Sequence, residues 1–241
     1  MARKKISLIG AGNIGGTLAH LIGLKELADV ILLDIAKGIP QGKSLDIAES
    51  SPVDGFDVDL TGSNNFSRIK NSDVIIVTAG SPRKPGMSRE ELIGINAKIV
   101  KEVSDELIRY SPNVILIIVS NPMDTMTYLA YKTLGIEKRR VIGMGGALDS
   151  ARFKYRISEA LSCPSSDISA MVIGAHSDKG MVPLTRLATR NSIPINQMLS
   201  HETIEKIRHE TKVGGATLTS MLGTSAWYAP GAAVSSIVHA I

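Results

Sequence analysis

Short apolar runs recur through the first half of the chain, and stretches with helical spacing separate them. The runs that predict strands lie at residues 6–10, 29–34, 57–62, 72–80 and 113–120. Between residues 89 and 110, apolar side chains return every three or four positions, which predicts one long amphipathic helix. Continuous Val and Ile runs that alternate with helices indicate a parallel sheet covered by helices on both faces.

Beyond Asn121 the pattern loosens. We expect a helix to about Leu134, a strand at VIGMG (141–145), a helix from Asp149, a strand over DISAMVIGAH (167–176) and helical stretches from His201 onward. These elements predict an α/β protein with a doubly wound parallel sheet over residues 1–143. A smaller α+β domain is expected over residues 144–241, and neither part contains a repeat or a low-complexity segment.

The composition is that of a soluble globular protein, with 44% apolar and 21% charged side chains among 241 residues. The 27 Lys and Arg exceed the 23 Asp and Glu, for a net charge of +4, but the positive charges are dispersed. The chain has only three Phe and one Trp. We therefore expect no nucleic-acid partner, while a slightly positive chain suits a small acidic substrate.

The cysteine content and the N-terminal residues favour a reducing compartment. Cys163 is the only cysteine, so no internal disulfide can form. MARKK leads directly into a strand-like run, without an apolar segment of signal-peptide length. The longest apolar runs are far shorter than the roughly 20 residues that a membrane span needs. We expect a cytoplasmic protein with no membrane partner.

A glycine-rich turn, GAGNIG at residues 10–15, follows the first predicted strand and opens a helix. Gly10 permits a tight turn, Gly12 lets the backbone approach a pyrophosphate, and Gly15 allows close packing of helix and strand. Asp34 ends the next strand 19 residues after Gly15, where a carboxylate accepts hydrogen bonds from an adenosine ribose and repels a 2′-phosphate. The motif predicts a dinucleotide-binding domain that uses NAD; the plain structural alternative is a tight turn followed by a strand-terminal aspartate.

Four polar residues further along the chain are candidates for chemistry. Asp149 and Arg152 stand three apart on a predicted helix and share a face, which is also the arrangement of a simple salt bridge. His176 ends a predicted strand in glycine-flanked surroundings, although a lone histidine is more often structural than catalytic. Asn121 follows a buried strand at the end where open α/β sheets bind ligands. Periodicity does not say whether these residues meet.

The stretch SPRKPGMSRE, at residues 81–90, combines two prolines and a glycine with Arg83 and Arg89. Proline fixes φ and glycine frees it, so a shaped loop is expected here rather than a helix or strand. The two guanidinium groups are either solvated surface charges or groups that close over an anion.

Six motifs in order resemble the lactate/malate dehydrogenase family: GAGNIGG, TAGSPRKPGMSR, SNPMD, GMGGALDSARF, GAHSD followed by MVPL, and GTSAWYAP. The resemblance runs from Lys5 to about Ile241. It implies a Rossmann domain and a substrate domain, with reversible hydride transfer between NADH and oxaloacetate to give malate. A place in the tricarboxylic acid cycle and assembly as a homodimer or homotetramer are also implied.

The resemblance also implies roles for individual residues. His176 resembles the proton donor and acceptor, and Asp149 its carboxylate partner. Arg152 is similar to the fork that grips the C1 carboxylate of the substrate. Arg89 resembles the loop arginine that polarises the ketone, and Arg83 occupies the position that separates dicarboxylate from monocarboxylate enzymes. The residues expected to contact the cofactor are Gly10, Gly12, Asn13, Ile14, Gly15, Asp34, Asn96, Val119 and Asn121; Asn121 also meets the substrate, and no metal is expected.

Two departures from the family pattern bear on these expectations. Ser177 stands where the family usually has glycine, and the Lys179–Gly180 stretch carries one extra residue. The chain ends at Ile241, whereas family members continue, so an incomplete substrate domain with an exposed apolar face is expected. Two alternatives remain open: a dehydrogenase for another 2-oxo acid such as pyruvate, and a truncated, catalytically silent nucleotide-binding or oligomer-forming protein.

Overall fold

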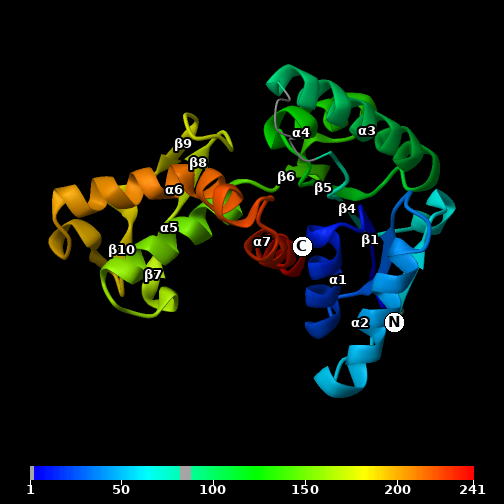
Figure 1. The fold of residues 1–241 in the computed structure, drawn as a ribbon, viewed down its shortest axis with the longest axis horizontal. Helices are drawn as coiled ribbons and strands as arrows, with labels where there is room; N and C mark the ends of the chain where they lie inside the picture. Colours follow the sequence, from blue (N-terminus) through cyan, green and yellow to red (C-terminus); the bar gives the residue numbers. More distant parts are fainter. Residues whose placement is uncertain (1–2, 82–87) are drawn as a thin grey trace. The chain divides into compact units, whose positions relative to one another are not determined.

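The computed structural model of the chain describes residues 3–81 and 88–241. These residues form two compact units (Figure 1). The first contains Met1–Met144 together with Pro230–Ile241, and the second contains Gly145–Ala229. The domain boundary predicted between residues 143 and 144 lies one residue before the break between the units and stays a prediction.

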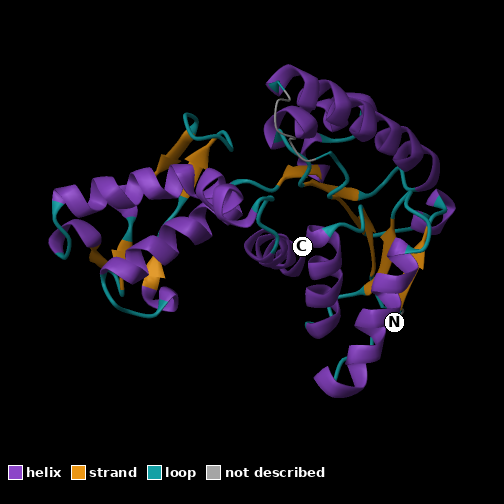
Figure 2. Cartoon of the chain, viewed as in Figure 1, coloured by secondary structure: helices purple, strands orange, loops and turns teal. Residues whose placement is uncertain are grey.

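The first unit is built on one parallel sheet of six strands, in the order β3-β2-β1-β4-β5-β6. Figure 2 draws the strands in orange. The strands are β1 (Lys5–Ile9), β2 (Asp29–Leu33), β3 (Leu60–Ser63), β4 (Val74–Val77), β5 (Ile115–Ile118) and β6 (Val141–Gly143). Strand order reverses between β1 and β4, which creates a switch point where the connections leave to opposite sides. Open α/β sheets bind ligands at the carboxyl ends of the strands beside such a point. The predicted doubly wound sheet is confirmed.

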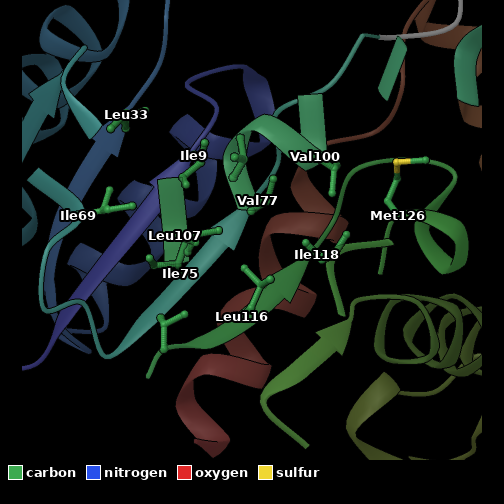
Figure 3. Packing of buried hydrophobic residues seen from close by; sticks show 13 residues of the cluster. Ile9, Leu33, Ile69, Ile75, Val77, Val100, Leu107, Leu116, Ile118 and Met126 are labelled. Carbon is green, nitrogen blue, oxygen red and sulfur yellow. The ribbon is translucent and has the colours of Figure 1, made fainter. Parts of the chain in front are cut away.

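Helices cover both faces of this sheet (Figure 1). They are α1 (Asn13–Leu24), α2 (Ile39–Asp54), α3 (Arg89–Tyr110), α4 (Met123–Leu134) and α7 (Tyr228–Ala240). On the α3 and α4 face, sheet residues such as Ile75 and Leu116 pack with Val100, Leu107 and Met126 of the two helices (Figure 3). Full burial of one such side chain contributes about 1.5–3 kcal/mol, so this cluster is a main support of the sheet.

The last helix, α7, returns to the first unit and lies against α1. A Cβ at Gly231 would lie 3.1 Å from Thr17 Cγ2 and 3.6 Å from Leu21 Cδ1, so the missing side chain permits close helix packing. Sequence periodicity predicted helices after His201 but did not indicate what this last one would pack on.

The second unit joins two helices to two small antiparallel sheets, with strand orders β11-β10-β7 and β8-β9. Its main elements are α5 (Gly146–Ala160), β7 (Ile168–Ser169), β8 (Val172–Gly174), β9 (Met181–Pro183), β10 (Thr189–Arg190), β11 (Ile193–Pro194) and α6 (His201–Leu222). Phe153 and Ile157 of α5 pack with Ile207 of α6 and with strand residues in one buried cluster. The predicted α+β character of this part is confirmed.

Single-turn 3-10 helices complete both units. They are η1 (Phe66–Ile69), η2 (Lys138–Arg140), η3 (Ser165–Asp167), η4 (Thr185–Leu187) and η5 (Ile195–Gln197). Of the helices within the described ranges, none is both long and apolar enough to span a bilayer.

The single strand predicted over residues 167–176 is wrong. The segment forms two strands in different sheets: β7 pairs with β10, and β8 pairs with β9. Alternating apolar and polar positions predict an extended segment but carry no information on its partner strand. Here the two halves of the segment pair with different strands. The helix predicted from Asp149 also begins earlier, at Gly146.

Candidate active site

The glycine-rich turn joins β1 to α1, and only one of its three fingerprint glycines has room for an added Cβ. Gly10 has φ +110°, and a Cβ there would lie 2.6 Å from Thr78 Oγ1. A Cβ at Gly15 would overlap the carbonyl oxygen of Gly10. A Cβ at Gly12 would meet no atom within 4 Å, so that position faces open space at the start of α1. Gly10 and Gly15 therefore serve the fold, while Gly12 leaves room for a ligand.

Asp34 is held at the end of β2 by backbone donors. Its Oδ2 accepts from the Ala11 amide at 2.6 Å, and its Oδ1 accepts from the Ala36 amide at 2.9 Å. Each carboxylate oxygen has further lone pairs, which can accept from the hydroxyls of a ribose. Asn64 donates to the carbonyls of Asp34 and Ala36, at 2.7 and 3.0 Å, and so stabilises the loop. Asn64 was not identified from sequence, because its role depends on β3 lying beside β2.

A cavity of about 730 Å³ opens beside these groups within the first unit. Its lining includes Gly10, Gly12, Asp34, Thr78 and Phe66. This volume falls within the roughly 300–1,000 Å³ that is usual for cofactor sites. The cavity lies at the carboxyl ends of β1, β2 and β4, where the fold class predicts a ligand.

Asn96 connects the loops that follow β4 and β5. It is buried, its Oδ1 accepts from the Ser81 amide at 2.7 Å, and its Nδ2 donates to the carbonyls of Ser81 and Asn121. Val119 is buried and its amide donates to Val77 at 2.9 Å, whereas Asn121 is exposed. Asn96 thus holds the two loops together, and its predicted cofactor contact, like those of Val119 and Asn121, stays a prediction.

A second polar cluster lies in the other unit and is centred on Asp149. Asp149 is buried, with 2% of the residue exposed, and it lies in the first turn of α5. Its Oδ2 lies 2.8 Å from His176 Nδ1, and its Oδ1 lies 3.5 Å from Arg152 Nη1. Because an ionised carboxylate only accepts, Nδ1 of His176 carries a hydrogen in this pair. Proton exchange with a substrate would then use the opposite ring nitrogen, Nε2.

Arg152 is desolvated by the helix packed against it. A Cβ at Gly214 would lie 3.5 Å from Arg152 Cδ, and one at Gly215 would lie 3.7 Å from Nη1, so the two glycines of α6 make room for the guanidinium. Burial lowers the pKa of Arg152, and the charge of Asp149 opposes that shift. Its Nε is buried and makes no hydrogen bond with a described residue. The guanidinium therefore retains capacity for an anionic ligand. The paired glycines in KVGGATL were the signal for this packing that sequence reasoning overlooked.

The loop that carries His176 is closed by its own hydrogen bonds. Ser177 Oγ accepts from the Gly180 amide at 3.1 Å, and the Ser177 carbonyl accepts from the amides of Gly180 and Met181, each at 3.0 Å. Ser150 Oγ accepts from the Val172 amide at 2.9 Å and ties α5 to β8. The serine and the lengthened loop are therefore compatible with the pair between His176 and Asp149.

The two loop arginines cannot be placed in the same way. Arg83 lies outside the described residues, and so does the side chain of Arg89. The backbone of Arg89 begins α3, behind a capping box in which Ser88 Oγ accepts from the Glu91 amide and the Glu91 carboxylate accepts from the Ser88 amide.

Comparison with known proteins identifies the family to which this chain belongs. Two family models match, described as the NAD binding domain of lactate/malate dehydrogenase, over residues 4–143, and its alpha/beta C-terminal domain, over residues 146–241. The chain belongs to the lactate/malate dehydrogenase family. The resemblance stated from the motifs and the NAD-binding nature of the first domain are confirmed.

Relatives within this family match along nearly the whole chain. The malate dehydrogenase of Parabacteroides distasonis is 53% identical over 241 residues, which cover 98% of this chain and 77% of that protein. The malate dehydrogenase of Flavobacterium johnsoniae is 55% identical over 239 residues, with shares of 98% and 77%.

Solved structures of family members superimpose closely. Cryptosporidium parvum malate dehydrogenase gives a TM-score of 0.94 at 43% identity, over 99% of this chain and 77% of that one. The lactate dehydrogenase of the same organism, solved with lactic acid and nicotinamide adenine dinucleotide, gives 0.95 at 39% identity, over 100% and 77%.

Proposed function

We propose that the chain catalyses reversible hydride transfer between NADH and oxaloacetate, giving malate. The observation that carries the proposal is the Asp149 carboxylate, buried between the His176 imidazole and the Arg152 guanidinium. This cluster offers a proton donor and an anion-binding fork, which reduction of a 2-oxo acid requires. The malate dehydrogenases at 53–55% identity support oxaloacetate as the substrate.

The side chains of the second unit perform the proton chemistry. NADH, when bound, supplies the hydride. A ketone that accepts hydride becomes an alkoxide, and Nε2 of His176 gives it a proton. Asp149 orients the ring through Nδ1 and stabilises its protonated form before the transfer. Arg152 binds the C1 carboxylate through two parallel hydrogen bonds, which a lysine cannot reproduce.

The first unit binds and orients the cofactor. Its residues fit NAD because Gly12 faces open space and the α1 N-terminus offers unpaired amides to a pyrophosphate. Asp34 accepts from the adenosine ribose and disfavours a 2′-phosphate by charge repulsion. Asn96 fixes the backbone of Ser81, in the loop after β4, and the backbone of Asn121, in the loop after β5.

The loop arginines complete the proposal for the substrate. Arg89 polarises the ketone of any 2-oxo acid, and Arg83 pairs with the second carboxylate of oxaloacetate. With pyruvate, Arg83 would be desolvated without a partner, at a cost of about 3–5 kcal/mol. That energy corresponds to a preference of roughly 10²–10³ or more for oxaloacetate.

The test is kcat/KM with NADH for oxaloacetate and for pyruvate, in the parent and in Arg83→Gln and Arg89→Gln. Arg83→Gln should lose most oxaloacetate activity and gain some with pyruvate, whereas Arg89→Gln should lower both. An unchanged preference in Arg83→Gln would make Arg83 a solvated charge. Parent protein without turnover on either substrate would favour the silent nucleotide-binding alternative.

The setting of the enzyme is also part of the proposal. With Cys163 as its only cysteine, the chain is suited to the reducing cytoplasm. We propose that it works there as a homodimer or homotetramer, as the family resemblance implies. Sedimentation equilibrium would measure the assembly, and a mass equal to one chain would contradict it.

A further inference from the structure

Lys43 reaches across from α2 to the glycine-rich turn. Its Nζ donates to the Gly12 carbonyl at 3.0 Å. Its stem lies over Gly16, where an added Cβ would be 3.3 Å from Cδ and 3.5 Å from Nζ of the lysine. Gly16 is the fourth glycine of GAGNIGG, and the three-glycine fingerprint does not account for it. The absent side chain at Gly16 leaves room for the lysine.

The position of this ammonium is electrostatically unfavourable by itself. It lies beside the first turn of α1, where the helix dipole is positive and where cations are disfavoured. The first turn holds no acidic residue, and Lys43 forms no ion pair with a described residue. Helix N-termini bind anions through their free N–H groups and their dipole, so an anion bound there would also offset the charge of Lys43.

The hydrogen bond also acts on the peptide group that faces the cofactor. The Gly12 carbonyl and the Asn13 amide belong to one peptide unit, and Gly12 borders the open space at the helix start. A charged donor on the carbonyl polarises that unit and makes its N–H a stronger donor. Lys43 therefore strengthens anion binding in two ways, by its charge and through the Asn13 amide.

We propose that Lys43 is a positioning residue for the cofactor diphosphate. This inference rests on the assignment of NAD to the first unit. It predicts that Lys43 raises the affinity for ligands that carry the diphosphate and does not change the affinity for adenosine alone. It also predicts that its contribution weakens with added salt, because part of it is Coulombic.

The experiment compares Lys43→Met, Lys43→Arg and a charge-matched control, Lys70→Met, whose lysine is exposed. ADP-ribose binding is measured by calorimetry at low and high salt, and adenosine binding by ligand-observed NMR. Lys43→Met should bind ADP-ribose about tenfold more weakly at low salt, the effect of losing one charge-assisted contact. Adenosine affinity and the affinities of Lys70→Met should change less than about twofold, and Lys43→Arg should restore most of the loss.

Two outcomes would overturn the inference while leaving the cofactor assignment intact. One is equal weakening of ADP-ribose and adenosine, which would make Lys43 a purely structural brace of the turn. The other is parent-like ADP-ribose affinity in Lys43→Met. If the parent itself failed to bind ADP-ribose, the cofactor assignment would fall together with the inference. Melting temperatures of all variants show whether each one folds.

Discussion

The two units build their binding groups in different ways. In the first, the turn between β1 and α1 works through its backbone: Gly10 and Gly15 allow the path, and Gly12 leaves space. In the second, the groups are charged side chains from separate elements, with Asp149 and Arg152 on α5 and His176 after β8. A site made of contiguous backbone is visible in a short motif, whereas a site made of distant side chains depends on the fold.

The difference also predicts how each site fails. Adding one carbon to the glycine turn changes either the fold or the space for a ligand, depending on the position. Removing one side chain of the Asp149 cluster leaves the backbone in place and removes a chemical step. The following changes test this contrast, from the largest expected effect to the smallest.

His176→Asn should abolish chemistry without affecting cofactor binding. Loss of general acid–base help typically lowers turnover by about 10²–10⁴-fold. The imidazole belongs to the cluster of the second unit, so NADH affinity should stay nearly unchanged. Steady-state kcat and fluorescence titration with NADH measure the two effects, with His201→Asn, an exposed histidine of the same unit, as control. A variant with most of its turnover would make His176 a structural residue.

Gly15→Ala and Gly12→Ala should separate folding from binding within one turn. The Gly15 Cβ would overlap the Gly10 carbonyl, so overpacking should destabilise the protein by about 1–3 kcal/mol. Gly12→Ala has room for its Cβ and should melt like the parent. Its methyl group occupies the space for the pyrophosphate, and the loss of one charge-assisted contact should weaken NADH binding about tenfold. Thermal melts and NADH titrations check both, and equal melting temperatures for the two variants would contradict the contrast.

Asp34→Ser should change the preference between NADH and NADPH and have little effect on substrate binding. Loss of the ribose hydrogen bonds should weaken NADH binding about tenfold, and removal of the charge should narrow the preference over NADPH. The measurement is kcat/KM for both cofactors at saturating oxaloacetate. Equal use of NADH and NADPH by the unaltered protein would refute the assigned role of Asp34.

Asp73→Asn should have the smallest effect, on stability alone. The Lys5 amide and then the Lys4 side chain donate to this carboxylate and lower the pKa of Asp73. A lowered pKa in the folded state contributes stability above the unfolded value of about 3.9, and the contribution disappears as pH falls through the folded value. Because the side chain is 41% exposed, solvent screening limits the contribution to below about 1 kcal/mol. Melts of parent and variant should therefore differ at pH 7 and should begin to converge as the pH falls below about 4, toward the lowered pKa of Asp73; a constant difference would exclude an ionic origin.

Local features of the first unit could be predicted from sequence because the chain encodes them at short range. The Val and Ile runs predicted the strands of the sheet, and the apolar spacing of residues 89–110 predicted α3 as observed. The glycine fingerprint and Asp34 predicted a ligand site at the ends of β1 and β2, where the structure has a cavity lined by Gly10, Gly12 and Asp34, since the turn and the strand end adjoin in every such sheet.

The tertiary structure alone decided which distant groups meet. Asp149 and His176 are 27 residues apart, and they lie 2.8 Å from each other because α5 packs beside β8. The desolvation of Arg152 depends on two glycines of α6, some 60 positions later, and the division of residues 167–176 depends on which strands become partners. The periodicity of a segment predicts its own conformation. Its strand partners and its burial depend on long-range packing, and many segments with the same pattern could pack with the same partner.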